Sequence, residues 1–420
     1  MAFFDDSINA ILVENLDKSF IQTLVQERPF LDRMTKKGGE GGSAKKVPFN
    51  AGAGGGQGAD LETALANAEE GLGTNYAWIV SPQKGYGVKV LNNWEVPYTE
   101  SPESAADAMT QATFQSAELA AQDFARNIYG DGHGTRGTIV SHTNPTGNIF
   151  VLTLESASEV AGFNMDNVIV SKATPTASID SGTAKVIGSS VQGLTIRVDA
   201  GSSGWTPTST HVIGLESEMI TGSTISTFPG VFGFVPPVDA RDSNFVVGDT
   251  FLGVVRDAAT PVEAVSGFAF DGRGKALISS VRTLAGYMGQ FKHSAPDTLY
   301  LNPIMGAKLA EAIQSAVRYD IMAKSDGAAE IFYAGFDFVL PTGKCTALMD
   351  PNCPVTEMVL TKADSWNFEY PGKSPFKPSS PTGRLYVEDY NSDRIRLSTI
   401  CTGFFYTTNP AATGVITVSA

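Results

Sequence analysis

Residues 132–137 have the spacing of a nucleotide-binding motif. They read Gly-His-Gly-Thr-Arg-Gly, and glycines so spaced form a dinucleotide-binding fingerprint when they follow a strand and open a helix, because phosphate then meets the helix N-terminus. Here the glycines follow a predicted helix, and glycine commonly marks helix ends. We therefore interpret the stretch as a turn, and Asp131 with His133 as part of that solvated turn and not as a catalytic pair.

The histidines and cysteines are the other candidates for chemistry. No two histidines have the paired spacing of metal ligands, and no Ser-His-Asp system can be assembled from residues close in sequence, although distant residues could still meet in space. Three cysteines make no even disulfide framework, so free structural thiols are expected. The residues are His133, His142, His211, His293, Cys345, Cys353 and Cys401. We predict no catalytic, cofactor-binding or metal site, no cofactor and no enzymatic activity; an enzyme whose residues converge from distant segments is the alternative.

The charge of the chain argues against a sequence-independent grip on nucleic acid. The formal net charge is -14 and the isoelectric point is near 4.8, whereas such binding depends on Lys and Arg that neutralise phosphates. Lys36, Lys37, Lys45 and Lys46 form a small basic patch. We interpret this patch as a solvated or acid-paired segment and not as a DNA site.

Composition and the first residues indicate the class of protein. The 420 residues are enough for two or three domains, and 43 glycines with only 18% charged residues favour a β-rich protein full of turns. Residues 1–6 contain acids and no basic segment, and no run of 18 apolar residues occurs. Neither a signal peptide nor a membrane span is therefore predicted, and we expect the chain to be cytosolic when made.

The first hundred residues predict an arm and a long excursion of the chain. Residues 8–34 carry apolar side chains at three- and four-residue steps, which predicts an amphipathic helix. A glycine-dense region at 38–56 follows, and residues 76–98 then alternate in the manner of strands, with a turn at 81–85. Because an isolated hairpin is marginal in water, this two-stranded excursion is expected to lie on another surface.

The middle of the chain predicts a long helix and then a β-rich unit. Ser101-Pro102-Glu103 is a helix start, and the pattern continues without a breaker to Tyr129, with small residues that would allow close packing on a sheet. From Thr138 to about Val255 short β-runs alternate with turn residues, which favours a small barrel or sandwich. The predicted strands there are 149–154, 168–170, 185–187, 194–198 and 212–215.

The last third predicts an α/β segment and then more strands. Residues 275–288 read as a helix, and a strand at 298–301 leads through Asn302-Pro303 into a helix ending at Tyr319. Four further strands are predicted, and residues 370–378 are expected to be an irregular loop stiffened by prolines. These strands are 358–361, 384–390, 395–406 and 415–419.

The order of these segments resembles the major capsid proteins of tailed bacteriophages, which have the Hong Kong 97 fold. Residues 299–315, which begin Leu-Tyr-Leu-Asn-Pro, are similar to the strand and helix of the family's axial domain. Residues 384–406 are similar to the closing strands of its peripheral domain. The similarity covers the whole chain as architecture.

The resemblance implies an α+β fold with an inserted β-domain. Its parts would be the N-terminal arm (1–45), an extended loop over the neighbouring subunit (46–98), the peripheral spine helix (99–135), an inserted small β-barrel or sandwich (136–255), the axial domain (256–355), and the peripheral strands with the C-terminus (356–420).

The resemblance also implies a function and partners. The chain would be the head protein that self-assembles into hexamers and pentamers of an icosahedral shell around double-stranded DNA, which it encloses without sequence-specific binding. Its partners would be itself, portal and scaffolding proteins and a decoration protein, with no membrane; it would be assembled in the host cytoplasm and located in the virion. Some members crosslink a loop lysine to a neighbour, and Lys84 and Lys89 lie in that region, but we predict no crosslink.

Two other functions fit the same sequence. An encapsulin-like compartment shell has the same fold, and a cargo enzyme encoded beside it, in place of portal and terminase, would distinguish it. An adhesive or carbohydrate-binding β-protein would use residues 136–255 as its binding part and would need secretion, of which the N-terminus gives no sign.

Overall fold

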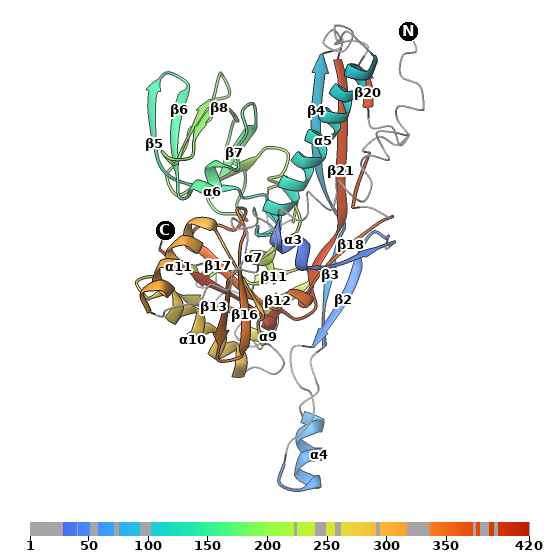
Figure 1. The fold of residues 1–420 in the computed structure, drawn as a ribbon, viewed down its shortest axis with the longest axis vertical. Helices are drawn as coiled ribbons and strands as arrows, with labels where there is room; N and C mark the ends of the chain where they lie inside the picture. Colours follow the sequence, from blue (N-terminus) through green and yellow to red (C-terminus); the bar gives the residue numbers. More distant parts are fainter. Residues whose placement is uncertain are drawn as a thin grey trace, which may run out of the picture.

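The computed structural model describes most of the 420 residues (Figure 1). The described ranges are 28–39, 41–50, 58–70, 75–92, 102–221, 225–239, 249–256, 262–290, 295–316, 336–372, 375–378, 386–389 and 394–419. Within them the chain forms two six-stranded sheets, a closed barrel and two two-stranded sheets.

A long helix lies along the first sheet (Figure 1). Helix α5 (Pro102–Asn127) confirms the helix expected after Ser101, and its buried small residues, such as Ala117 and Ala120, let it lie close to strands β4 and β21. Ser116 Oγ on the helix is 2.7 Å from Thr399 Oγ1 on β21. The strands of this sheet are β1 (Thr35–Gly38), β4 (Gln83–Asn92), β18 (Trp366–Tyr370), β19 (Phe376–Pro378), β20 (Tyr386–Asp389) and β21 (Arg394–Thr407).

The prediction that the strands on either side of the turn at 81–85 form a hairpin is wrong. Strand β3 (Asn75–Val80) pairs with β2 (Lys45–Asn50), and β4 pairs with β21 over ten residues. The reason is burial: Trp78 and Val80 of β3 pack into the core beside Val47 and Phe49 of β2, whereas the glycines of β4 lie against α5. The two-stranded excursion is thus the β2–β3 ribbon, and helix α4 (Leu61–Glu70), which we did not predict, lies beyond its end (Figure 1).

The second sheet carries a core on each face. Its order is β13-β22-β17-β14-β16-β15. Leu299 and Leu301 of β14 pack with helices α10 (Leu277–Gln290) and α11 (Pro303–Ala316), whereas Tyr300 between them packs into the core of the first sheet. Alternate strand residues point to opposite faces, so one sheet joins the two cores into a single body. The strands are β13 (Phe268–Asp271), β14 (Thr298–Leu301), β15 (Phe336–Leu340), β16 (Gly343–Met349), β17 (Glu357–Thr361) and β22 (Thr413–Thr417).

Two expectations for the last part of the chain need correction. Residues 356–420 do not complete one sheet, because β17 and β22 join the second sheet and the strands between them join the first. The expected irregular loop at 370–378 contains β19, which pairs with β21. Short 3-10 turns, η2 (Ala363–Ser365) and η3 (Pro410–Ala412), lead from one sheet to the other.

Of the small barrel or sandwich expected in the middle of the chain, the structure has the barrel. Its six strands close in the order β10-β5-β6-β9-β8-β7. The barrel is shorter than the segment 136–255, because Phe228, α7 (Val231–Phe234) and β12 (Val254–Arg256) pack into the core of the first sheet. Its elements are β5 (Gly137–Thr146), β6 (Ile149–Leu154), α6 (Ala157–Val160), β7 (Val168–Lys172), β8 (Ala184–Ser190), β9 (Thr195–Asp199) and β10 (Val212–Leu215); β12 itself pairs with β11 (Asp249–Phe251).

The helix expected at 8–34 is interrupted near its C-terminal end, at Arg28. Helix α3 (Pro29–Arg33) begins after Arg28, which is extended, because a residue before proline is disfavoured in the helical conformation. Residues 8–27, the end of the expected helix at Tyr319 and the start of the expected strand at 384 lie outside the described residues. Helix α9 (Val262–Ser266) precedes β13.

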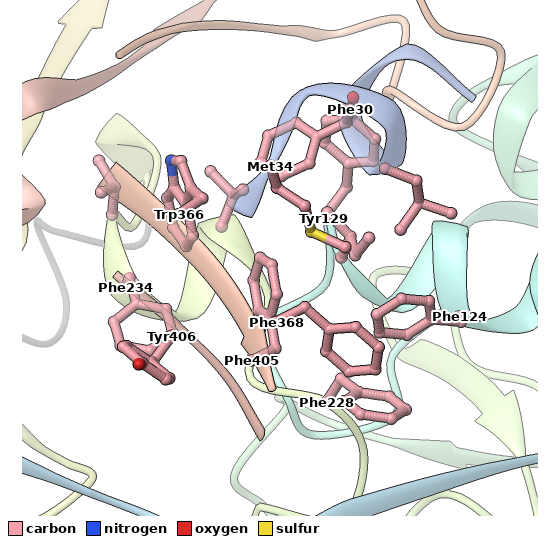
Figure 2. Packing of buried hydrophobic residues seen from close by; sticks show 14 of the residues in the cluster. Phe30, Met34, Phe124, Tyr129, Phe228, Phe234, Trp366, Phe368, Phe405 and Tyr406 are labelled. Carbon is pink, nitrogen blue, oxygen red and sulfur yellow. The ribbon is translucent and has the colours of Figure 1, made fainter. Parts of the chain in front are cut away.

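Aromatic side chains fill the place where the elements meet. Phe30 of α3 lies among Tyr129, Tyr300 and Trp366, with ring centroids 5.5, 4.7 and 5.9 Å away, and Figure 2 shows this packing around Trp366 and Phe405. Tyr129, just beyond α5, also donates a hydrogen bond of 2.9 Å from its hydroxyl to the buried Asp350. The N-terminal segment, the long helix and both sheets therefore share one core.

Candidate assembly surfaces

The glycine stretch at 132–137 is a turn. It leads from α5 into strand β5, so no helix follows the glycines, and the context that a dinucleotide site requires is absent there. Gly132 and Gly134 have φ angles of 88° and 75°, which suit glycine. Asp131 Oδ1 accepts a hydrogen bond of 2.8 Å from the backbone N–H of His133. The carboxylate stabilises the turn. Asp131 and His133 are half-buried, however, so the turn is not the solvated one that the sequence predicted.

One histidine does meet a carboxylate and a serine in the barrel. His211 Nδ1 is 2.8 Å from Asp180 Oδ2, and Ser171 Oγ donates to the same oxygen at 2.7 Å. Trp205 Nε1 donates to Ser171 Oγ at 3.1 Å. Asp180 lies between the serine and the histidine, so His211 is not placed to take a proton from Ser171, as a nucleophilic triad requires. Sequence spacing could not indicate this network, because its members come from different strands and loops.

The other residues considered for chemistry lie apart from one another. The three cysteines are free and buried, and burial raises the pKa of the Cys345 thiol to about 12. His142 is exposed on β5, and His293 lies outside the described residues. In the described part of the chain, no group of three His, Cys, Asp or Glu side chains could hold a metal ion, and no helix is long and apolar enough to cross a membrane.

Two of the four basic-patch lysines are acid-paired, as expected. Lys45 forms an ion pair with the buried Glu369, and Lys37 lies 4.0 Å from the same carboxylate. Tyr406 donates a hydrogen bond of 2.7 Å to Glu369. Burial by itself would raise the pKa of Glu369, but the hydrogen bonds from Lys45 and Tyr406 and the lysine charges outweigh it and lower the pKa. This pair ties strand β2 at the base of the ribbon to the first sheet.

Glu357 is a buried carboxyl that sequence reasoning did not identify. It lies in β17, and Thr417 Oγ1 donates to its Oε2 at 3.1 Å. Burial raises the pKa of Glu357 to about 8, and the charges of Asp239 and Glu155 act in the same direction. Between the ordinary pKa of 4.5 and about pH 8, Glu357 is protonated in the folded protein but ionised in the unfolded chain. The folded state is therefore most stable relative to the unfolded chain below the ordinary pKa, and it loses that stabilisation as the pH rises to about 8.

We expect Glu357→Gln, which mimics the protonated carboxyl, to stabilise the protein at alkaline pH. A pKa displaced by one pH unit corresponds to about 1.4 kcal/mol, so the gain is expected to be on the order of 3 kcal/mol at about pH 8.5 and less than half of that at about pH 5.5. Urea unfolding at both pH values measures it, with the exposed Glu216→Gln as control. An equal effect of Glu357→Gln at both pH values would contradict the assignment.

Helix α4 presents apolar side chains at the far end of the ribbon. Leu61 is 76% exposed and Leu65 is 55% exposed, and residues four apart lie on one face of a helix. Asp60 begins the helix, with Oδ1 accepting from Thr63 N at 2.8 Å and Oδ2 from Thr63 Oγ1 at 2.9 Å. These hydrogen bonds lower the pKa of Asp60. The helix is thus capped by its own residues while its leucines face solvent.

Strand β4 presents a second apolar surface. Tyr86, Val88 and Val90 are exposed, and Lys84 continues this row, whereas Gly85 and Gly87 on the other face lie against α5. Lys89 belongs to the covered face and is half-buried. Of the two loop lysines considered for crosslinking, Lys84 therefore points outward with the apolar row.

Comparison with known proteins gives structural matches only. No family model matches the chain, and no curated protein matches its sequence. Solved phage structures do match. The capsid asymmetric unit of Cyanophage A-1(L) is 11% identical with a TM-score of 0.49, and the match covers 93% of this chain and 91% of that chain.

Two further matches come from other particles. A structure of Mycobacterium phage Ogopogo is 10% identical, with a TM-score of 0.44 and coverage of 93% of this chain and 91% of that one. The capsid of a native GTA particle is 9% identical, with a TM-score of 0.43 and coverage of 93% and 89%. At these identities the similarity concerns the fold alone.

Proposed function

We propose that this chain is the major capsid protein of a tailed phage, a structural subunit that self-assembles into the hexamers and pentamers of an icosahedral shell. The shell encloses double-stranded DNA, and portal, scaffolding and decoration proteins are its further partners. The subunit is assembled in the host cytoplasm and is located in the virion. The net charge of -14 fits a wall that encloses DNA without adhering to it.

The projecting ribbon is the observation that carries this proposal. Strands β2 and β3 pair only with each other as a two-stranded sheet, and such a ribbon is at most marginally stable in water by itself. One face of the ribbon is buried from Val80 at its base to Phe49 near its far end. Helix α4, however, lies well beyond that core (Figure 1), with Leu61 and Leu65 exposed. A subunit with this shape gains burial for its tip by lying on another copy of itself.

The rest of the architecture fits the same role. Helix α5 with the first sheet would be the peripheral part, and the second sheet the axial part, that the family resemblance implies; the barrel would be an addition to them. The fold thus supplies a body, an arm that extends from it and an extra module. Each part has a use in a closed shell built of identical subunits.

Electron microscopy of the purified protein, with light scattering for mass, tests the proposal. Closed shells, or rings of five and six subunits, at neutral pH and moderate salt are expected. A stable monomer that never assembles, even with candidate scaffolding or portal proteins present, would contradict it. If shells form, a gene for a cargo enzyme beside this one, in place of portal and terminase, would favour the encapsulin-like alternative.

A further inference from the structure

The barrel has an apolar core of its own. Leu152, Ile169, Ile196 and Val198 belong to a buried cluster made entirely of residues 139–215, whereas the two cores of the body meet across the second sheet. An interface without a shared apolar core resembles a contact between separate domains, for which relative motion is the ordinary expectation. Polar contacts at its base then help to set the position of the barrel, together with the two chain connections to the body.

Arg136 is the centre of those contacts. It stands where the chain enters the barrel, and its side chain is nearly buried. Its guanidinium donates to both oxygens of Glu218, with Nε to Oε2 at 2.8 Å, and it also pairs with Asp123. Asp123 belongs to helix α5 and Glu218 follows the last barrel strand, so one side chain joins the body to both ends of the barrel.

A second arginine completes the cluster. Arg126 of α5 donates from Nη1 to the carbonyl of Gly162 at 3.0 Å and from Nη2 to that of Ala161 at 2.9 Å. These carbonyls end helix α6 at the base of the barrel, and Arg136 Nη1 also reaches Gly162 O at 3.1 Å. The arginines present rigid forks of donors, so they specify an orientation as well as an attraction.

Other charged groups near the cluster are few in the described residues. Glu159 of α6 accepts from the backbone N–H groups of Thr138 and Glu155, both at 3.1 Å, so it is held within the barrel. Asn127 Nδ2 donates to Asp123 Oδ2 at 3.3 Å. Two arginines and two carboxylates make the cluster electrically neutral, and burial raises the pKa of Asp123 to about 6. The charges of Arg136 and Arg126 act in the opposite direction and lower the pKa of Asp123.

We infer that the barrel is a self-contained module and that Asp123, Arg126, Arg136 and Glu218 form an ionic clamp that sets its orientation on the body. The clamp acts on position and not on the folding of either part. Breaking it leaves the barrel folded and the body folded, and frees the angle between them. In a shell, the clamp would make every copy present its barrel in the same direction.

Distance measurements between spin labels in the full-length protein test this inference. Labels are placed at Val191→Cys, in the exposed turn between β8 and β9, and at Lys308→Cys, exposed on α11. The native cysteines are buried, so they are not expected to react with the label. Labelled protein is diluted with unlabelled protein, so that distances between subunits do not contribute.

Two variants break the clamp to different extents. Arg136→Met removes the central guanidinium. The quadruple variant Asp123→Asn, Arg126→Met, Arg136→Met, Glu218→Gln removes all four charged groups, so that no charge is left buried without a partner. We expect the distance distribution to become about twofold broader or more in both variants, because the barrel samples several orientations. The matched control is Arg273→Met, whose arginine pairs with Asp239 and Asp271, each at 2.9 Å, on the surface. It is expected to keep the narrow distribution.

Amide hydrogen exchange separates orientation from folding. Protection of barrel strands β6, β8 and β9 is expected to stay within about twofold of wild type, whereas residues 131–136 and 216–221 exchange at least about tenfold faster. An unchanged distance distribution in both variants would overturn the clamp. Loss of protection throughout the barrel strands in the quadruple variant would overturn the independence of the barrel, because the cluster would then be part of what folds it.

Discussion

Replacing both Leu61 and Leu65 by Asp is expected to abolish shell formation while the subunit stays folded. These leucines lie on one face of α4 and are exposed in the isolated chain, so their replacement removes little burial from the subunit itself. In a shell each would be covered by a neighbour, where burial of a leucine contributes about 1.5–3 kcal/mol and a carboxylate would be desolvated without a partner. The same loss of binding free energy occurs at every copy of the interface in the shell. Even a small loss at each copy is therefore expected to prevent a closed shell from forming.

Light scattering and electron microscopy measure the assembled fraction, and thermal unfolding measures the subunit. The matched control is the double variant Met165→Asp, Val191→Asp, which places the same two charges on barrel residues that are 67% and 47% exposed. We expect the control to assemble. Shells formed by the Leu61→Asp, Leu65→Asp variant at the wild-type yield would show that α4 is not an assembly contact, and loss of shells in both proteins would show that the effect is not specific to α4.

Among the glycines that the structure describes, Gly87 is the one at which replacement by alanine is expected to destabilise the protein most. A Cβ at Gly87 would lie 1.9 Å from the carbonyl oxygen of Ser116 and 2.6 Å from the backbone nitrogen of Ala120. Both atoms belong to the backbone of α5, which cannot turn aside as a flexible side chain does. Overpacking of a core by added methylenes typically costs about 1–3 kcal/mol, and we expect about 3 kcal/mol or more here because the helix must move away from β4.

Urea unfolding, or the yield of soluble protein where the variant does not fold, measures this effect. Gly188→Ala is the control, because Gly188 is also a strand glycine and a Cβ there would meet nothing within 4 Å. The control is expected to stay within about 1 kcal/mol of wild type. A Gly87→Ala protein as stable as the control would mean that α5 and β4 do not approach as closely as their backbones indicate.

Local pattern alone determined where many elements lie. The strands at 149–154, 212–215 and 298–301 were predicted with the bounds they have, and the helices after Ser101 and Asn302 begin at their prolines. Proline at the first helical position and alternation along a strand act within a few residues. The close packing of α5 through its small residues also followed from the sequence. Frequent turns predicted a small barrel or sandwich in the middle of the chain, but not which of the two it is, and not that six strands close it.

Only the tertiary structure decided which elements pair and which residues meet. An apolar, alternating stretch such as 76–80 suits any partner strand, so its pairing with β2 in place of β4 depended on where Trp78 could be buried. The division of residues 356–420 between two sheets, the Ser171–Asp180–His211 network and the clamp at Arg136 join residues far apart in the chain. Such contacts depend on how apolar side chains are buried and charges are paired over the whole molecule. A short stretch of sequence does not contain this information.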